Sequence, residues 1–276
     1  MNDGLNRRYE KLKEIITSLG KVVVAFSGGV DSTFLLKVCM DSLGSVNVIA
    51  VNAVSPTYPE RERNEAAELA RSAAGRLITF AAAEMENPDF VANGPDRCYH
   101  CKTELFRTIR EIARKEGFAH VLEGSNADDL SDYRPGQRAC TEAGAISPLV
   151  DAGLSKEDIR ALSKELGLPT HNKPAQACLA SRIPYGMPVT IDRLRRIELS
   201  EAFIRDLGIA QVRVRHDGST ARIEVEEKDL SAILAYRDAI AEKLTVLGFM
   251  YVSLDLQGYR AGSMNDEIVA EGDGLA

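Results

Sequence analysis

The stretch Ser27-Gly28-Gly29-Val30-Asp31-Ser32 follows an apolar run at 21–26 and precedes a helix-like segment at 33–39. The run is short, rich in β-branched residues and closed by glycines, which predicts a strand buried on both faces of a parallel sheet. Gly28 and Gly29 let the backbone turn and approach an anion without a Cβ atom in the way. The following helix would present free N–H groups and its positive dipole end to that anion. The sequence therefore predicts a strand, a polyphosphate-binding turn and a helix.

Strand-like and helical patterns alternate through the first part of the chain. Further strands are expected near residues 45–51, 77–80 and 119–123, with helical segments between them. This alternation predicts an α/β fold, a parallel sheet with helices on both faces. Ligands of such sheets bind where the strands end, and the turn at 27–32 lies at that edge.

The later part of the chain has its own pattern. Residues 168–190 contain four prolines and show no periodicity, which indicates a domain boundary. We expect a first domain at 1–170 and a smaller C-terminal α+β domain at 171–276. The second domain is expected to hold a helix at 191–207, strands, and a long helix at 229–247.

Composition limits the partners and the compartment. The 276 residues include 34 Lys and Arg against 41 Asp and Glu, a net charge of -7, so no overall field would attract a nucleic acid. No apolar stretch approaches the ~20 residues that span a bilayer, and the first residues lack an apolar signal core. We therefore expect a cytoplasmic protein with no nucleic-acid or membrane partner.

The five cysteines are an odd number, which argues against a disulfide framework and favours metal binding or thiol chemistry. Cys98 and Cys101 form a CxxC pair at a predicted helix start, which suits a redox dithiol, half of a zinc site or part of an iron–sulfur site. Together with Cys178, on the proline-containing loop, they would leave one iron of a four-iron cluster without a protein ligand. Cys39 is expected in the core, and Cys140 is interpreted as structural.

Two arginines of the second domain form a candidate anion site. Period-two alternation in the predicted strand 211–216 puts Arg213 and Arg215 on one face, about 6.6 Å apart. Two guanidiniums so placed can hold one phosphate or carboxylate. The alternative is an exposed pair facing Arg222 and Glu224 on the neighbouring strand.

The turn at 27–32 lacks the spacing and the lysine of a Walker A motif. Its S-G-G-x-D-S pattern instead resembles the pyrophosphate loop of the PP-loop ATP pyrophosphatases, whose fold is of the adenine nucleotide alpha hydrolase-like type. Members of that superfamily hold the β and γ phosphates of ATP there, while a nucleophile attacks the α phosphate. The segment Gly124 to Asp129 resembles their second nucleotide segment, whose acidic residue helps position ATP and magnesium.

Further segments make the resemblance more specific. Residues 178–186 (Cys-x-x-Ser-Arg-x-Pro-Tyr-Gly), 132–136, 212–216 and 258–260, together with the turn, look like the LarE family, nearly end to end. LarE proteins are ATP-dependent sulfurtransferases that help build the nickel-pincer nucleotide cofactor of lactate racemase. Their substrate is pyridinium-3,5-biscarboxylic acid mononucleotide, whose carboxylates are adenylated and then converted to thiocarboxylates. The resemblance also implies a homo-oligomer.

The resemblance implies a role for each matching residue. Pyrophosphate and magnesium contacts fall on Ser27, Gly28, Gly29, Asp31 and Ser32, with Asp128 or Asp129 assisting. Contacts to the substrate or to the AMP phosphate fall on Ser181, Arg182, Arg213, Arg215 and Arg260. Cys178, Ser181, Arg182 and Glu201 are the expected catalytic residues.

Two kinds of sulfur supply are known in the family. In one, the cysteine that matches Cys178 gives up its own sulfur and is used once. In the other, three cysteines hold a [4Fe-4S] cluster whose open iron carries an extra sulfide, supplied by a sulfide donor. Because Cys98 and Cys101 are present beside Cys178, we expect the cluster-dependent kind.

Three other functions remain open at this stage. A PP-loop tRNA thiolase would also combine ATP, cysteines and sulfur transfer, although the acidic charge and the lack of a basic extension count against it. An ammonia-dependent amide synthetase of the same superfamily would not need the three cysteines. A non-catalytic carrier of sulfide or of an iron–sulfur cluster, gated by nucleotide, would form no AMP.

Overall fold

The structure, a computed structural model, describes residues 3–73, 75–131, 135–174 and 177–260. The chain divides into two compact units, Met1–Asn87 with Asp96–Gln176, and Pro88–Pro95 with Ala177–Ala276. The division expected from the sequence, between residues 170 and 171, falls in the same proline-containing stretch. Within the described ranges no helix combines the length and the apolar character needed to cross a membrane.

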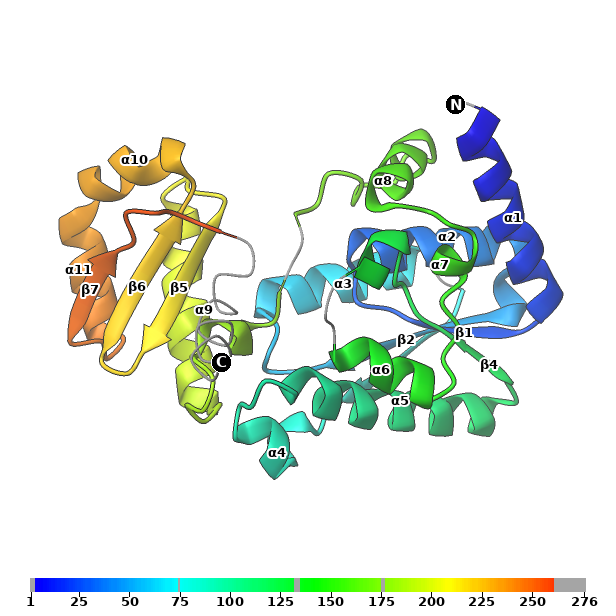
Figure 1. Ribbon diagram of the computed structural model, residues 1–276, viewed down its shortest axis with the longest axis horizontal. Coiled ribbons are helices and arrows are strands. Elements are labelled where there is room, and N and C mark those ends of the chain that lie inside the picture. The colour runs from blue at the N-terminus through cyan, green and yellow to red at the C-terminus, as the bar shows by residue number, and fades with distance from the viewer. Residues whose placement is uncertain (1–2, 74, 132–134, 175–176, 261–276) are drawn as a thin grey trace, which may run out of the picture. The chain divides into compact units, whose positions relative to one another are not determined.

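The first unit is built on a parallel sheet with the strand order β3-β2-β1-β4. Its strands are β1 (Val22–Ala25), β2 (Val48–Val54), β3 (Leu77–Ala81) and β4 (His120–Leu122). Its helices are α1 (Asp3–Leu19), α2 (Val30–Leu43), α3 (Glu60–Ala73), α5 (Arg97–Glu116), α6 (Pro135–Glu142), α7 (Pro148–Asp151) and α8 (Lys156–Glu165). Short 3-10 turns are η1 (Ser45–Asn47), η2 (Glu84–Glu86) and η3 (Ala127–Ser131). The expected α/β fold is confirmed (Figure 1).

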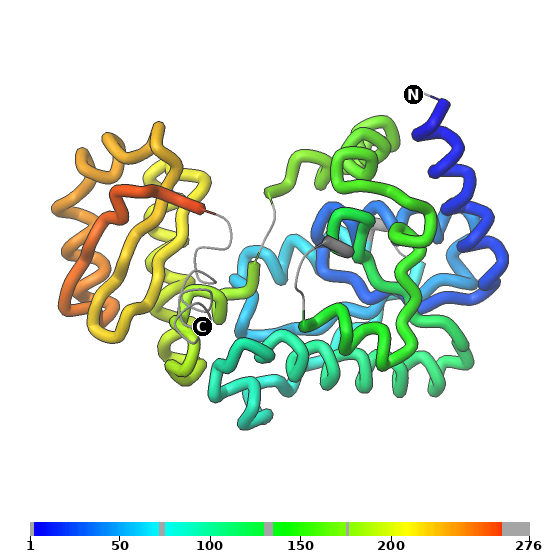
Figure 2. The backbone as a smooth tube through the Cα atoms, in the orientation of Figure 1, coloured from blue at the N-terminus to red at the C-terminus, as the bar shows by residue number. Residues whose placement is uncertain are grey.

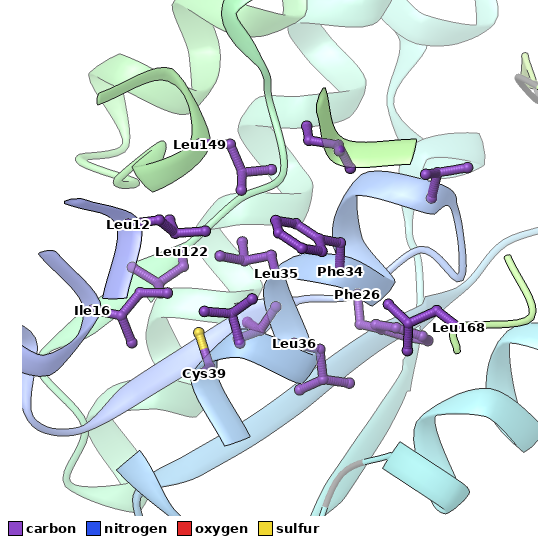
Figure 3. Packing of buried hydrophobic residues seen from close by; sticks show 14 of the residues in the cluster. Leu12, Ile16, Phe26, Phe34, Leu35, Leu36, Cys39, Leu122, Leu149 and Leu168 are labelled. Atoms are coloured by element: carbon purple, nitrogen blue, oxygen red, sulfur yellow. The ribbon is translucent and has the colours of Figure 1, made fainter. Parts of the chain in front are cut away.

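The central strand β1 is buried on both faces of the sheet, as the apolar run at 21–26 predicts. Val22 and Val24 belong to a buried cluster with Phe34 and Leu35 of α2. Figure 3 shows how Phe34 and Leu35 lie in this cluster. Val23, between them, packs on the opposite face in the cluster of Phe106 on α5. The alternation of neighbouring valines therefore anchors β1 between two helical layers.

The order of the strands places the phosphate-binding turn at a switch point. From β1 the chain moves outward to β2 and β3, and then returns to place β4 on the other side of β1. The turn at 27–32 follows β1, and Gly124 follows β4. A Cβ atom on Gly124 would lie 3.2 Å from the backbone nitrogen of Ser32, so glycine lets the two strand ends approach. Crevices of this kind are where open parallel sheets bind ligands.

The second unit contains a three-stranded sheet in the order β5-β6-β7, with β5 and β6 antiparallel and β6 and β7 parallel. Its elements are η4 (Leu179–Arg182), α9 (Ile191–Asp206), β5 (Val212–Asp217), β6 (Thr220–Val225), η5 (Glu227–Asp229), α10 (Leu230–Ala235), α11 (Arg237–Val246) and β7 (Tyr251–Leu254). Figure 2 traces this α+β unit from yellow-green to red. The single helix expected at 229–247 is wrong, because the backbone of Tyr236, at φ −97° and ψ 11°, leaves the helical conformation and separates α10 from α11.

A short segment from the first half of the chain belongs to the second unit. It includes α4 (Pro88–Val91) and Asn93, a fully buried residue with φ 60°. The Asn93 amide donates to the carbonyls of Ile183, Pro184 and Met187 at 3.2, 2.7 and 2.9 Å. One side chain thus satisfies three carbonyls of a proline-containing loop that lacks regular structure.

Candidate functional site

The turn after β1 is held by its own side chains. The hydroxyl groups of Ser27 and Ser32 lie 3.1 Å apart, and the Ser32 hydroxyl also lies 3.3 Å from the backbone nitrogen of Ser27. Gly28 has φ +73°, and a Cβ atom there would lie only 2.5 Å from the Cβ of Ala66 on α3. The conformation of the turn and the close packing of α3 both require glycine at this position.

A cavity of about 370 Å³ lies against this turn, entirely within the first unit. Its polar wall includes Ser27, Gly29, Asp31, Ser32, Ser125 and Asp129. Its apolar wall includes Val51, Leu105, Phe106 and Ile109. A cavity with an apolar wall and an anion-binding loop has the size and chemistry for a nucleoside polyphosphate.

Asp31, in the first turn of α2, has two different carboxylate oxygens. Oδ2 lies 2.5 Å from Nζ of Lys156 at the start of α8. Oδ1 is buried and has no hydrogen-bond partner among the described residues. Burial raises the pKa of Asp31, and the Lys156 ammonium opposes that rise. An orphaned carboxylate oxygen on a cavity wall fits a magnesium ion, which takes oxygen ligands.

The structure separates the two other acidic candidates. Asp129 lines the cavity, and its Oδ2 accepts a hydrogen bond from the backbone nitrogen of Asn126 at 2.9 Å. Asp128 is not among the cavity residues, and its Oδ2 accepts from the backbone nitrogen of Lys156 at 2.9 Å. Asp129 therefore accompanies Asp31 at the cavity, whereas Asp128 ties η3 to α8.

Several polar residues that no sequence motif marks also line the cavity, among them Asn52, Glu123 and Lys102. Asn52 of β2 donates from its amide to the carbonyl of Phe26 at 2.7 Å. Glu123, only 7% exposed, accepts hydrogen bonds at the end of β4, and Lys102 enters from α5. Glu123 follows an apolar run in the sequence, and a polar residue at the end of a predicted parallel strand indicates a ligand site. Lys102 gives no such signal, because lysines on helices are mostly solvent-exposed.

In the second unit, the expected catalytic residues Arg182 and Glu201 form one buried cluster. Arg182 is fully buried, and its guanidinium donates to both carboxylate oxygens of Glu201 at 2.9 and 3.2 Å. The same guanidinium donates to the carbonyls of Ala177 and Cys178 at 2.7 and 3.0 Å. Ser181 adds its hydroxyl to the Cys178 carbonyl at 2.8 Å. Arg182 therefore fixes the backbone that carries Cys178.

Arg213 and Arg215 are both buried, so the exposure assumed in the alternative is wrong, but the pair does face Glu224 and Arg222 on β6. Arg215 forms a two-pronged ion pair with Glu224, at 2.9 and 2.7 Å. Arg213 makes no ion pair with a carboxylate in the part of the chain that the structure describes, and its guanidinium lies 5.3 Å from the ring centre of Tyr259. Burial, and secondarily the nearby charge of Arg182, lowers the pKa of Arg213. An anion would relieve this excess of positive charge.

The expected substrate contact Arg260 lies at the end of the described chain. It is exposed, and its charge interacts with Asp255 in the same unit.

The cysteines divide between the two units. Cys98 is exposed in the first turn of α5, Cys101 is half-buried one turn later, and Cys178 is half-buried in the second unit. Among the residues whose placement is described, no group of three His, Cys, Asp or Glu side chains lies close enough to hold a metal ion. Cys39 and Cys140 are buried, which confirms the core position expected for Cys39 and is consistent with a structural Cys140. Burial raises their pKa to about 12 and about 11.

Comparison with known proteins gives two similarities that cover only part of the chain. The family model described as NAD synthase matches residues 5–87, which include the turn after β1. The argininosuccinate synthase of Methanosarcina barkeri is 29% identical over 170 residues, 56% of this chain and 42% of that protein. The residues that the NAD synthase family model matches include the phosphate-binding turn.

Other relatives match nearly the whole chain. An uncharacterised protein of Synechocystis is 40% identical over 263 residues, 95% of this chain and 98% of that protein. The pyridinium-3,5-bisthiocarboxylic acid mononucleotide synthase of Lactiplantibacillus plantarum is 40% identical over 253 residues, 92% of each chain. With this extent of similarity, and with the turn, sheet and cavity of a PP-loop protein, the chain belongs to the LarE family of ATP-using PP-loop enzymes.

Proposed function

We propose that the protein is an ATP-dependent sulfurtransferase that converts the carboxylates of pyridinium-3,5-biscarboxylic acid mononucleotide to thiocarboxylates, as a step of nickel-pincer nucleotide synthesis. The observation that carries the proposal is the cavity of about 370 Å³ against the turn at 27–32, with its apolar wall and anion-binding loop. The substrate is proposed from the name of the Lactiplantibacillus plantarum relative, a pyridinium-3,5-bisthiocarboxylic acid mononucleotide synthase.

The proposed reaction begins with activation of a carboxylate, which is a poor electrophile until one oxygen becomes part of a leaving group. A substrate carboxylate oxygen attacks the α-phosphorus of ATP, and the bond from that phosphorus to the bridging oxygen of the β-phosphate breaks. Pyrophosphate leaves with the electron pair, and sulfur later displaces AMP. The turn at 27–32 is suited to hold the departing pyrophosphate, because its backbone N–H groups and the Ser27 and Ser32 hydroxyls converge there.

Magnesium fits the acidic side of the same cavity. Asp31 would hold it through the buried Oδ1, and Asp129 lies on the same wall. When bound, the ion would neutralise charge on the phosphate oxygens. In this proposal the turn at 27–32 and η3, which carries Asp129, position the polyphosphate between them.

The phosphate of the mononucleotide is assigned to the second unit. Arg213 supplies a buried positive charge, and Arg215, Ser181 and Arg260 belong to the same unit. Glu201 is proposed as a positioning residue. Its two oxygens already accept from Arg182, Arg205 and the backbone nitrogen of Val214.

Two sulfur sources remain within the proposal. Cys98 and Cys101, one helical turn apart, and Cys178 have the donor chemistry of a three-thiolate [4Fe-4S] site, which would supply an open iron for the transferred sulfide. The alternative is single use of the Cys178 sulfur. We further propose a cytoplasmic homo-oligomer that serves lactate racemase maturation, with a separate sulfide donor in the cluster-dependent case.

The test is product analysis under anaerobic conditions with ATP, magnesium and the biscarboxylic mononucleotide. We expect AMP and pyrophosphate in equal amounts, and a mass gain of the mononucleotide that corresponds to replacement of oxygen by sulfur. ADP and phosphate, or an amide product with ammonia, would contradict the proposal. Tight binding of tRNA at moderate salt, with thiolation of the tRNA, would favour the thiolase alternative. Release of AMP together with any product would exclude a non-catalytic carrier, because a carrier forms no AMP.

A further inference from the structure

Lys102 lies in the second turn of α5, next to Cys101, and its side chain enters the first unit. It lines the nucleotide cavity of about 370 Å³ together with the residues of the phosphate-binding turn. It also lines a smaller cavity of about 50 Å³ that includes Cys101, Ser55 and Glu84. Its stem packs against α6, since a Cβ atom on Gly136 would lie 3.2 Å from the Lys102 Cγ. The lysine therefore stands between the nucleotide cavity and the side of α5 that carries the CxxC pair.

The surroundings of Lys102 keep its ammonium group charged inside the first unit. Burial lowers the pKa of Lys102, but the neighbouring Tyr58, Cys140, Glu123 and Cys101 raise it by more, and Glu123 is the carboxylate among them. Within the described residues, Lys102 forms no ion pair. A cation in this setting favours an anionic ligand.

The carboxylate of Glu123 is already engaged with other groups. Glu123 accepts at Oε2 from the backbone nitrogen and hydroxyl of Ser125, at 3.0 and 2.8 Å, and at Oε1 from the hydroxyl of Ser147. Three donors therefore engage both oxygens of the carboxylate, and the lysine is not among them. This arrangement leaves the lysine charge available to the cavity.

The position of Lys102 along α5 indicates which part of a bound nucleotide it would contact. α5 connects β3 to β4, which are parallel strands of the same sheet, so it runs back from the edge where the strands end. Leu105, Phe106 and Ile109 line the cavity further along the helix and form its apolar wall. Lys102 precedes them, nearer the edge that carries the turn at 27–32. A nucleotide with its pyrophosphate end on that turn and its nucleoside on the apolar wall would have its α-phosphate between the two.

We propose that Lys102 is a catalytic residue of the adenylation step, whose ammonium group contacts the non-bridging oxygens of the α-phosphate. This inference rests on the proposed function and adds a residue to it. As the carboxylate oxygen attacks and the bond to the β-phosphate breaks, negative charge is spread over the α-phosphate oxygens. A fixed ammonium group stabilises that charge without transferring a proton.

The experiment compares Lys102→Met, which keeps the packing of the stem and removes the charge, with Lys102→Arg and with Lys115→Met. Lys115 is exposed in the last turn of the same helix. Two quantities are measured for each folded variant: the dissociation constant of ATP without the mononucleotide, and the single-turnover rate of AMP formation at saturating ATP. We expect Lys102→Met to change the ATP dissociation constant less than ~3-fold and to lower the rate about 100-fold or more. Lys102→Arg should recover part of the rate, and Lys115→Met should match the wild type.

The outcomes separate the two proposals. Wild-type protein that forms no AMP from ATP and the mononucleotide contradicts the proposed function itself. Wild-type protein that forms AMP, together with a Lys102→Met variant within ~3-fold of its rate, overturns only the role of Lys102. A loss explained entirely by weaker ATP binding also overturns it, because a ground-state phosphate contact would give that result. Should Lys102→Met not fold, Lys102→Gln, with its polar end group, serves in the same comparison.

Discussion

Arg182 and Glu201 form a fully buried ion pair, with the guanidinium Nε 2.9 Å from carboxylate Oε1 and Nη2 3.2 Å from Oε2. The arginine holds the carbonyl of Cys178 on its other side. Burial opposes ionisation of Glu201, but the charge and hydrogen bonds of Arg182 prevail and keep its pKa below the ordinary value. The geometry of the cysteine loop therefore depends on a carboxylate located on a different element, α9.

Neutralising this carboxylate should destabilise the second unit and loosen the loop. We expect Glu201→Gln to lower the free energy of unfolding by about 3–5 kcal/mol, because it leaves the Arg182 charge buried without its partner. Glu242→Gln, on the exposed face of α11, is the matched control and should change stability by less than ~0.5 kcal/mol. Denaturant unfolding measures both variants. If Glu201→Gln were as stable as the Glu242→Gln control, a structural role for the ion pair of Arg182 and Glu201 would be contradicted.

Gly28 and Gly20 provide a second matched comparison. Both have left-handed backbone conformations, with φ +73° and +72°, but only at Gly28 would a Cβ atom collide with Ala66. Gly20→Ala should cost about 1 kcal/mol from backbone strain alone and leave ATP binding intact. Gly28→Ala should cost about 1–3 kcal/mol more and weaken ATP binding by at least tenfold, because the turn must shift away from α3. Calorimetric titration with ATP checks this, and equal affinities would contradict it.

The first unit could be predicted largely from local sequence. The apolar run at 21–26, the glycines after it and the alternation of patterns specify a parallel sheet, because strands buried on both faces leave a continuous apolar signal. The second unit was predicted less well. Tyr236 is neither glycine nor proline, so the local sequence does not indicate the break between α10 and α11. Asn93 joins the second unit through three contacts to residues about 90 positions away, which no local pattern encodes.

The site was predicted where its residues follow a motif. The turn at 27–32 and Asp129 lie at the nucleotide cavity, whereas Lys102 and Lys156 depend on how α5 and α8 pack against the sheet. Glu201 illustrates the same limit. A glutamate on a helix is usually exposed, and only the tertiary structure shows that three cationic or backbone donors surround it.

Lys156 should compete with magnesium for Asp31, because its ammonium group lies 2.5 Å from Oδ2. We expect Lys156→Met to reduce the magnesium concentration that supports half-maximal ATP binding by about tenfold, as the carboxylate loses its internal partner. Lys164→Met, exposed on the same helix, should leave the requirement unchanged. Titration of magnesium at fixed ATP measures the effect. An increased requirement in Lys156→Met would show that the lysine assists the metal instead.

His216 should make the stability of the second unit sensitive to acid. Its ring packs 5.1 Å from the ring of Phe249, and neither ring nitrogen has a hydrogen-bond partner in the described ranges. Burial, aided by the charges of Arg193 and Arg196, lowers its pKa below the ordinary value. At a pH between the lowered pKa of the folded chain and the ordinary pKa of histidine, His216 is therefore protonated in the unfolded chain and neutral in the folded chain.

The sign of the pH effect follows from that difference. Stability should be complete above about pH 6.5, the ordinary histidine pKa, and should fall as the pH decreases from there toward the lowered pKa of the folded state. His216→Phe should flatten this dependence, while His120→Gln, which retains His216, should keep it. Unfolding curves between pH 5 and 8 measure how the free energy of unfolding depends on pH. The same dependence in His216→Phe as in the wild type would contradict the role given to His216.

The cysteines give the decisive test of the sulfur source. Cys98 and Cys101 are accessible on α5, whereas burial of Cys140 raises its thiol pKa to about 11 and disfavours the thiolate that a metal needs. Protein purified without oxygen should therefore contain about four irons and four sulfides per chain, lose them in Cys98→Ala, and keep them in the Cys140→Ala control. Iron and sulfide assays with a visible spectrum provide the measurement. A colourless wild-type protein that still forms thiocarboxylate would instead identify Cys178 as the donor. Mass spectrometry should then find dehydroalanine at that position after one turnover, because the sulfur leaves with the product and only the unsaturated residue remains.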